Sequence, residues 1–309
     1  MSFALVFPGQ GSQSVGMMEP FAGFPIVRDT FAEASDALGQ DLWQLVAEGP
    51  AESLNATVNT QPIMLTAGYA LYRLWREQGG TAPAMVAGHS LGEYTALVTA
   101  GAIAFRDALP LVRFRAQAMQ EAVPIGTGAM AAILGVADDA VREACNEASQ
   151  GEVVEAVNFN APSQVVIAGH KAAVERGVAA CKARGAKRAV LLPVSAPFHS
   201  SLLTPAARRL ADYLEDVQFQ APAIPVVNNV DVATVEKPAA IKDALARQAC
   251  SPVRWVEVMR RMKEAGIDGI GECGPGKVLA GLVKRIDGTL QGVAIADLQG
   301  LKDALGTLK

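Results

Sequence analysis

The sequence has little cysteine, little histidine and no excess of basic residues over its 309 positions. Its four cysteines lie far apart and form no C-x-x-C pair, so neither a disulfide framework nor a zinc site is expected. The net charge of -4 offers no broad basic field to attract nucleic acid or an anionic membrane. We therefore expect a protein of the reducing cytoplasm that binds neither of them. The cysteines are Cys145, Cys181, Cys250 and Cys273.

Long hydrophobic runs are also absent. Residues 1–8 have no basic segment and only a short apolar stretch before Pro8, which is typical of neither a signal peptide nor a membrane span. Hydrophobic residues make up 50% of the chain and charged residues 19%, as in ordinary globular α/β enzymes. The length is sufficient for a large core, in one domain or two.

The sequence does contain a G-x-S-x-G motif, Gly88-His89-Ser90-Leu91-Gly92. Glycines on either side of the serine leave room for a sharp strand-to-helix turn that pushes the hydroxyl out of a sheet. Free backbone N–H groups at the helix N-terminus would then stabilise an oxyanion. The motif alone also fits a tight turn whose serine only caps the helix. A buried strand before the motif and a helix after it favour a nucleophile.

Strands alternate with helices along most of the chain, which predicts an α/β fold with a mostly parallel sheet covered on both faces. Within residues 125–192 the order becomes βαββαβ, which is typical of a ferredoxin-like unit. We therefore expect a discontinuous large domain of the α/β-hydrolase type, residues 1–124 and 193–309. A small ferredoxin-like subdomain, residues 125–192, would be inserted into it.

The expected elements follow from hydrophobic periodicity and from turn residues. One helix is expected to open at a Thr60 cap followed by Pro62. Strands are expected at residues 2–7, 83–88, 130–134, 153–158, 164–168, 189–192, 225–228, 267–271 and 293–295. Helices are expected at residues 60–76, 106–122, 138–149, 172–184, 202–217, 239–248 and 278–286, with a further helix opening at Gly92.

Arg115 is the unusual residue of the helix at 106–122. On a helical wheel it falls in the middle of the apolar stripe, whereas Arg113 falls on the solvent side. An inward-facing guanidinium needs an anionic partner, because an unpaired buried charge is strongly destabilising. That partner is either an internal Asp or Glu or a carboxylate that the substrate supplies.

A serine nucleophile needs a base, and the chain has only three histidines. His89 is adjacent to the serine, and side chains of neighbouring residues at such a turn diverge. His170 begins a helix and is expected at the surface. His199 lies in the loop 195–200, where the chain returns from the small domain to the large one and where clefts form. No acid stands out as a third member, so a backbone carbonyl is the alternative group to orient the imidazole.

The segment Gly271-Glu272-Cys273-Gly274-Pro275-Gly276-Lys277 matches the G-x-x-x-x-G-K pattern of a nucleotide-binding loop. Val278 replaces the Ser or Thr that would hold magnesium, and Pro275 removes a backbone N–H from the phosphate cradle. We expect a strand-to-helix turn here, one that could line the active site, and no nucleotide.

Further motifs occur in order along the chain. They are Phe7-Pro8-Gly9-Gln10-Gly11-Ser12-Gln13, the serine motif extended to Glu93-Tyr94, Gly126-Thr127-Gly128-Ala129-Met130, Asn160-Ala161-Pro162-Ser163-Gln164-Val165-Val166-Ile167-Ala168-Gly169, Phe198-His199 and Pro252-Val253-Arg254-Trp255. From about residue 3 to residue 280 the sequence closely resembles the malonyl-CoA:acyl carrier protein transacylases, acyltransferases of fatty-acid and polyketide synthesis.

The resemblance implies a role for each matching residue. Ser90 would take the malonyl group as an ester, and His199 would be the general base. Arg115 would pair with the free carboxylate of malonate. The backbone N–H groups of Gln10 and Leu91 would form the oxyanion hole.

Three further roles are implied in the same way. The main-chain carbonyl of Gln248 would hold the histidine, which accounts for the missing acid. His89 would lie near the substrate in a supporting role. Phe198 resembles the malonyl-selecting form of the related polyketide enzymes, in which a bulky ring crowds an α-methyl branch.

The implied mechanism is ping-pong transfer from malonyl-CoA to the phosphopantetheine thiol of an acyl carrier protein, by a monomer with no bound cofactor or metal. Scattered surface cations could meet an acidic carrier, namely Arg113, Arg208, Arg209 and Lys277.

Three alternatives stay open at this point. A free-standing acyltransferase of a polyketide synthase would use the same chemistry. A serine hydrolase would need a catalytic Asp between the serine and the histidine, with the histidine near the C-terminus, and neither is evident. A non-catalytic relative that binds carrier proteins would be favoured by loss of Ser90, His199 or Arg115, and all three are present.

Overall fold

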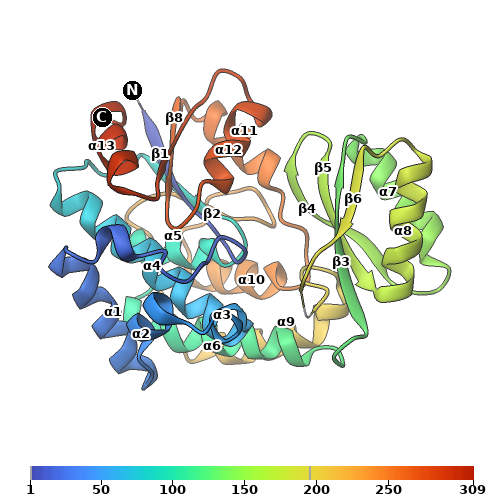
Figure 1. Cartoon of the computed structure of the whole chain (residues 1–309), viewed down its shortest axis with the longest axis horizontal. Helices are drawn as coiled ribbons and strands as arrows, with labels where there is room; N and C mark the ends of the chain where they lie inside the picture. Colours follow the sequence, from blue (N-terminus) through green and yellow to red (C-terminus); the bar gives the residue numbers. More distant parts are fainter. Residues whose placement is uncertain (1, 195) are drawn as a thin grey trace.

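The computed structural model describes residues 2–194 and 196–309, and a parallel five-stranded sheet lies at its centre (Figure 1). Its strands are ordered β7-β2-β1-β8-β9, and each adjacent pair is parallel, as the alternation of strands and helices predicts. The strands are β1 (Phe3–Phe7), β2 (Met85–Gly88), β7 (Val226–Val227), β8 (Gly269–Cys273) and β9 (Gln291–Ile295).

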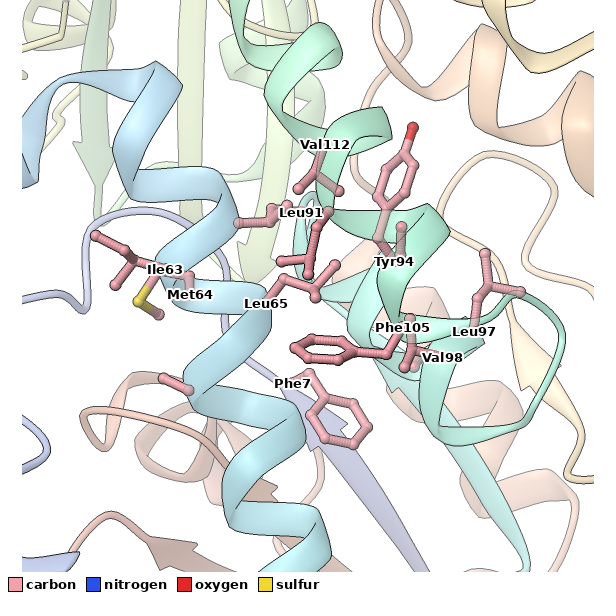
Figure 2. Close-up of a cluster of buried hydrophobic side chains, with 14 of the residues drawn as sticks. Phe7, Ile63, Met64, Leu65, Leu91, Tyr94, Leu97, Val98, Phe105 and Val112 are labelled. Carbon is pink, nitrogen blue, oxygen red and sulfur yellow. The ribbon is translucent and has the colours of Figure 1, made fainter. Parts of the chain in front are cut away.

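Strand β1 is buried on both faces, because its side chains alternate between two hydrophobic cores. Phe3, Leu5 and Phe7 join the larger core, and Ala4 and Val6 join the smaller one. The larger core packs against α4 (Thr57–Glu77), α5 (Gly92–Thr99) and α6 (Phe105–Glu121), and Figure 2 shows part of it around Phe7. The smaller core packs against α11 (Trp255–Glu264) and α12 (Val278–Ile286).

The remaining helices complete the layers around this sheet. They are α1 (Pro25–Leu38), α2 (Leu42–Glu48), α3 (Ala51–Asn55), α9 (Thr204–Glu215), α10 (Pro238–Gln248) and α13 (Leu298–Thr307). In the described part of the chain, no helix combines the length and the apolar character needed to cross a membrane.

A second sheet is antiparallel and lies to one side of the first (Figure 1). Its strands are ordered β4-β5-β3-β6, and α7 and α8 pack together against it. The chain order β3-α7-β4-β5-α8-β6 is the βαββαβ order read from the sequence. The elements are β3 (Gly128–Leu134), α7 (Asp138–Ser149), β4 (Val154–Ala161), β5 (Gln164–His170), α8 (Lys171–Ala183) and β6 (Arg188–Leu191).

Backbone hydrogen bonds join this second sheet to the segment between α10 and α11. The Val253 N–H donates to the Val157 carbonyl at 2.8 Å, and the Phe159 N–H donates to the Val253 carbonyl at 3.0 Å. Val253 therefore pairs with β4 as a one-residue strand would, and it fixes β4 beside the large sheet.

Several local predictions differ from the structure. The predicted Thr60 cap is wrong, because α4 already begins at Thr57 and the Thr60 hydroxyl donates to the Leu54 carbonyl at 2.7 Å instead. Pro62 consequently lies inside the helix rather than in its first turn. The predicted helix from 202 starts with the separate 3-10 turn Ser201–Leu203, and β8 lies two residues later than expected.

Candidate active site

The serine motif forms the predicted strand-to-helix turn. Strand β2 ends at Gly88, α5 begins at Gly92, and Ser90 between them has a φ of 53° in the left-handed region. A Cβ atom on Gly88 would lie 1.8 Å from the Gly92 carbonyl carbon, and one on Gly92 would lie 2.0 Å from the Phe7 carbonyl oxygen. Both positions therefore require glycine, because the turn presses against its own backbone and against β1.

The Ser90 hydroxyl meets an imidazole from a distant part of the chain. The distance from Ser90 Oγ to His199 Nε2 is 2.7 Å, and His199 Nδ1 lies 2.9 Å from the Gln248 carbonyl oxygen. Because a carbonyl only accepts, Nδ1 carries the hydrogen and Nε2 is left to accept from the serine. Gln248 ends α10, where helix carbonyls lack intrahelical partners. The predicted loop around the histidine includes residue 195, which lies outside the described residues.

The imidazole is held in its neutral form. His199 is buried, and burial together with the positive charge of Arg115 lowers the pKa of His199 to about 3. Its backbone φ of 67° is also left-handed, as at Ser90. Such conformations are costly and cluster at functional sites, and here both belong to the reacting pair.

Arg115 is buried with 1% of its surface exposed, as the wheel predicts. Its guanidinium donates to Gln61 Oε1 at 2.7 Å, to Gln248 Oε1 at 2.9 Å and to Ser90 Oγ at 3.2 Å. Among the described residues it forms no ion pair with a carboxylate. The guanidinium is thus held by neutral amides, with its charge directed at the nucleophile.

Two backbone N–H groups lie free beside the serine. Gln10 and Leu91 both line the cavity, and within residues 2–194 and 196–309 neither N–H donates to a protein acceptor. The Ser90 N–H itself is occupied, since it donates to Asn229 Oδ1 at 2.8 Å. The Gln10 side chain is fixed by a 3.1 Å bond to Thr57 Oγ1. This pair of N–H groups can receive an oxyanion.

The cavity over Ser90 has a volume of about 130 Å³. His89, Phe198, Leu91 and other predicted residues line it, whereas Gln248 lies behind Arg115. His89 Nε2 pairs with Asn160 Oδ1 at 2.8 Å, so this ring is engaged away from the serine. The wall opposite the serine turn consists mostly of residues from the second sheet and the segment after it: Met130, Asn158, Leu192 and Val194.

Gln61, Glu93 and Asn229 belong to the site, and the sequence analysis missed all three. Glu93 is 2% exposed, and burial raises the pKa of its carboxyl to about 7. Gln61 and Glu93 could have been identified from the sequence, because each is a polar residue within an apolar helical segment. Asn229 gave no such signal, because it lies in a polar turn.

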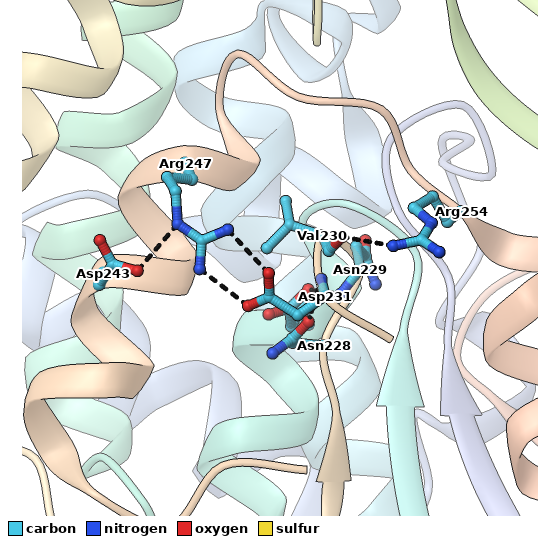
Figure 3. A network of polar contacts seen from close by, with 8 residues as sticks. Asn228, Asn229, Val230, Asp231, Asp243, Arg247 and Arg254 are labelled. Carbon is cyan, nitrogen blue, oxygen red and sulfur yellow. Dashed lines mark hydrogen bonds and ion pairs between the residues drawn. The ribbon is translucent and has the colours of Figure 1, made fainter. Parts of the chain in front are cut away.

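That turn, residues 228–231, is fixed by arginines on either side (Figure 3). Arg247 forms a bidentate pair with Asp231 at 2.8 and 2.9 Å. Arg254 donates to the Val230 carbonyl at 3.0 Å. Asn229 is therefore held at a defined position under the serine turn.

The other sequence candidates lie outside this cavity. Residues 271–273 end strand β8, and residues 274–277 form the predicted strand-to-helix turn into α12. Gly274 in this turn packs against Pro8 rather than against the nucleophile. Arg113 is not a free surface cation, because it donates to Leu38 and Gln40, and Arg209 and Lys277 are paired with acidic side chains. Arg208 is exposed.

The chain matches the family model "Acyl transferase domain" over residues 4–287. It is 59% identical over 304 residues to the malonyl CoA-acyl carrier protein transacylase of Escherichia coli K12, a match that covers 98% of each protein. The chain belongs to this family of acyltransferases.

Other transacylases of the family are similar over their full length. The Bacillus subtilis protein is 43% identical over 308 residues, covering 99% of this chain and 97% of that protein. The crystal structure of the acyl-carrier-protein S-malonyltransferase from Burkholderia pseudomallei is 65% identical, with a TM-score of 0.98 and coverage of 99% and 100%. A malonyl-transacylase solved with its type II PKS acyl-carrier protein is 54% identical, with a TM-score of 0.98 and coverage of 99% of each chain.

Proposed function

We propose that this acyltransferase moves the malonyl group from malonyl-CoA to the phosphopantetheine thiol of acyl carrier protein in fatty-acid synthesis. One observation carries the proposal. Arg115 is buried, has no carboxylate partner among the described residues and lies 3.2 Å from Ser90 Oγ. A substrate carboxylate on the acyl group would neutralise it, and malonyl is the smallest common acyl group that carries one.

The first half-reaction forms a malonyl ester on Ser90. His199 Nε2 removes the hydroxyl proton while Oγ attacks the thioester carbonyl carbon. The carbonyl oxygen becomes an oxyanion that accepts hydrogen bonds from the N–H groups of Gln10 and Leu91. When the C–S bond breaks, His199 returns the proton to the sulfur, and coenzyme A leaves as a thiol.

The second half-reaction reverses these roles. The carrier thiol gives its proton to His199 and attacks the ester carbonyl, and the same N–H pair stabilises the oxyanion. The ester C–O bond then breaks, and His199 returns the proton to Ser90 Oγ. The Gln248 carbonyl orients the imidazole in both steps, a role that hydrolase triads give to an acid. The proposed chemistry requires no metal or resident cofactor.

Selection among donors would come from the walls of the cavity. Arg115 favours a carboxylate at the far end of the acyl group, and Phe198 crowds a branch on the α-carbon. His89 would support the acyl group from its bond with Asn160. Malonyl-CoA would therefore be preferred to both acetyl-CoA and methylmalonyl-CoA.

The wider context of the proposal rests on coarser observations. The βαββαβ order supports a ferredoxin-like subdomain at 125–192, inserted into a hydrolase-like domain formed by 1–124 and 193–309. The four cysteines are free, which supports the cytoplasm. We expect a monomer, since carrier protein and coenzyme A thioester can reach a site built from one chain.

A polyketide carrier is the second candidate partner. The related malonyl-transacylase solved with its type II PKS acyl-carrier protein supports it. The reaction on this chain would be identical, and only the carrier would differ.

The test is intact-protein mass after brief exposure to malonyl-CoA, acetyl-CoA or methylmalonyl-CoA, with Ser90→Ala as control. We expect a malonyl adduct that forms selectively, requires Ser90 and leaves when a phosphopantetheinylated carrier is added. Accumulation of free malonate without transfer would instead indicate a hydrolase, and absence of both adduct and hydrolysis a binding protein. Comparing fatty-acid and polyketide carriers in the second step identifies the partner.

A further inference from the structure

Glu93 is a buried carboxylate that contacts neither Ser90 Oγ nor His199, yet it bonds to the residues that hold both. Its Oε2 atom accepts from the Asn229 backbone N–H and from the Gln248 side-chain Nε2, each at 2.9 Å. A carboxylate that is buried in this way destabilises the folded state unless hydrogen bonds compensate for its lost hydration.

The Gln248 amide has a single orientation that satisfies its neighbours. Its Oε1 accepts from Arg115 at 2.9 Å, while its Nε2 donates to the Ser90 carbonyl at 3.0 Å and to Glu93. The reversed amide would place an NH2 group against the guanidinium and an oxygen against the Glu93 carboxylate. Glu93 and the Ser90 carbonyl are the two acceptors that keep Nε2 away from Arg115, and Glu93 is the one of the two supplied by a side chain.

Glu93 also acts on the serine turn through Asn229. With its backbone N–H bound to Glu93, the Asn229 side chain accepts the Ser90 N–H at 2.8 Å and donates to the Gly88 carbonyl at 2.8 Å. Glu93 Oε2 thus bonds both to Gln248, which holds the Arg115 guanidinium, and to Asn229, which holds the serine turn.

We propose that Glu93 is a positioning residue that sets donor selectivity: it fixes the Gln248 amide so that Arg115 is directed at the acyl site. The proposal rests on the function proposed above, in which Arg115 binds the malonyl carboxylate. What matters is an acceptor oxygen at the position of Oε2 rather than the negative charge.

Two conservative variants separate these properties. Glu93→Gln keeps the length of the side chain and removes the charge. Its amide oxygen can still accept from both the Asn229 N–H and Gln248 Nε2. Glu93→Asp keeps the charge but is one methylene shorter, so its oxygens move away from Gln248 Nε2. The readout is the ratio of kcat/KM for malonyl-CoA to kcat/KM for acetyl-CoA, with the melting temperature of each variant.

Glu272 provides the matched control. It is a second buried glutamate, fully enclosed at the end of β8, and its Oε2 accepts the Ala280 N–H at 2.8 Å. In the described part of the chain it forms no hydrogen bond or ion pair with Gln248 or Arg115. Glu272→Gln and Glu272→Asp therefore report the effect of altering a buried carboxylate without altering the selectivity contacts.

We expect Glu93→Asp to lower the malonyl-to-acetyl ratio about tenfold or more, the effect of losing one buried hydrogen bond, and Glu93→Gln to stay within about threefold of the parent. Both Glu272 variants should keep the parent ratio. An unchanged ratio in Glu93→Asp would overturn the proposal, and so would a ratio that falls in Glu93→Gln but not in Glu93→Asp, because the charge would then be the cause.

A purely structural role would appear as a parallel loss with both donors and a lowered melting temperature, and it would also overturn the proposal. A parent enzyme that fails to prefer malonyl-CoA would contradict the proposed function itself, which separates that failure from a failure of the role of Glu93.

Discussion

At the scale of single residues, the site depends on two unusual charge states. Arg115 remains charged among neutral amides, and His199 remains neutral beside it. Each state prepares the site for the substrate: the first leaves a positive charge free to bind an anion, and the second leaves Nε2 free to take a proton.

Replacing Arg115 with alanine should weaken malonyl transfer much more than acetyl transfer. The charge-assisted bonds to a malonyl carboxylate are strong, so we expect a loss of about 100-fold in kcat/KM for malonyl-CoA. Residual acetyl transfer should change by less than about tenfold, because acetyl offers no carboxylate to bind. Parallel steady-state assays with both donors check this, and an equal loss with both would contradict the assigned role.

The acylation of Ser90 should be insensitive to pH where an ordinary histidine titrates. His199 acts as a base only when neutral, and its pKa is lowered from 6.5 to about 3. The kcat/KM for malonyl-CoA, which reports the free enzyme, should therefore show no inflection near pH 6.5 and should fall only as the pH approaches the lowered value. Rapid-quench measurement of the acyl-enzyme from about pH 5 to 8 tests this. A half-maximal rate near pH 6.5 that persists in Glu93→Gln, which removes the nearby carboxyl with a pKa of about 7, would mean that the pKa of His199 is not lowered.

At the scale of elements, the serine turn packs so closely against its own backbone and against β1 that Gly88 and Gly92 leave no room for a side chain. Gly92→Ala should destabilise the fold by about 3 kcal/mol, because the new Cβ would lie 2.0 Å from the Phe7 carbonyl oxygen. Gly281→Ala in α12 is the matched control, since nothing lies within 4 Å of its Cβ position. That change should stabilise the protein by about 0.5 to 1 kcal/mol. Urea unfolding of both variants measures the difference, and equal midpoints would show that the turn can relax.

How far the sequence predicts this site depends on the kind of group. The serine turn and the inward face of Arg115 could be predicted because glycine spacing and helical periodicity are local. The hydrogen bond from His199 to the Gln248 carbonyl could be predicted only indirectly, from the lack of a suitable acid, because every residue has a backbone carbonyl. Asn229 could not be found, because its role depends on how β7 pairs with β2, a contact between distant segments.

The same distinction holds for the elements. The buried strands of the central sheet could be predicted from continuous apolar runs. Helices α1, α2, α3, α11 and α13 were not predicted. Asp41 and Asp297 cap α2 and α13, a local start signal that the sequence analysis missed. In contrast, α1, α3 and α11 have no side-chain hydrogen bond at the N-cap. Their position is set by packing against the core, which no local pattern reveals.

At the scale of the whole molecule, the active site lies between the two sheets, and their relative position determines its width. The backbone hydrogen bonds of Val253 join β4 to the segment between α10 and α11. The amides of Val253 and Phe159 should therefore exchange with solvent as slowly as those of β1, at the rate of global unfolding. Native-state hydrogen exchange tests this. Distinctly faster exchange at both amides would show that the second sheet separates by itself.

Strand β1 pairs with β8, which lies far from it along the chain. A nascent chain that ends at β6 already contains Ser90 but lacks both His199 and the Gln248 carbonyl. Its serine has no base and stays chemically inert. The nucleophile therefore gains its base only when the segments before and after the second sheet have folded against each other.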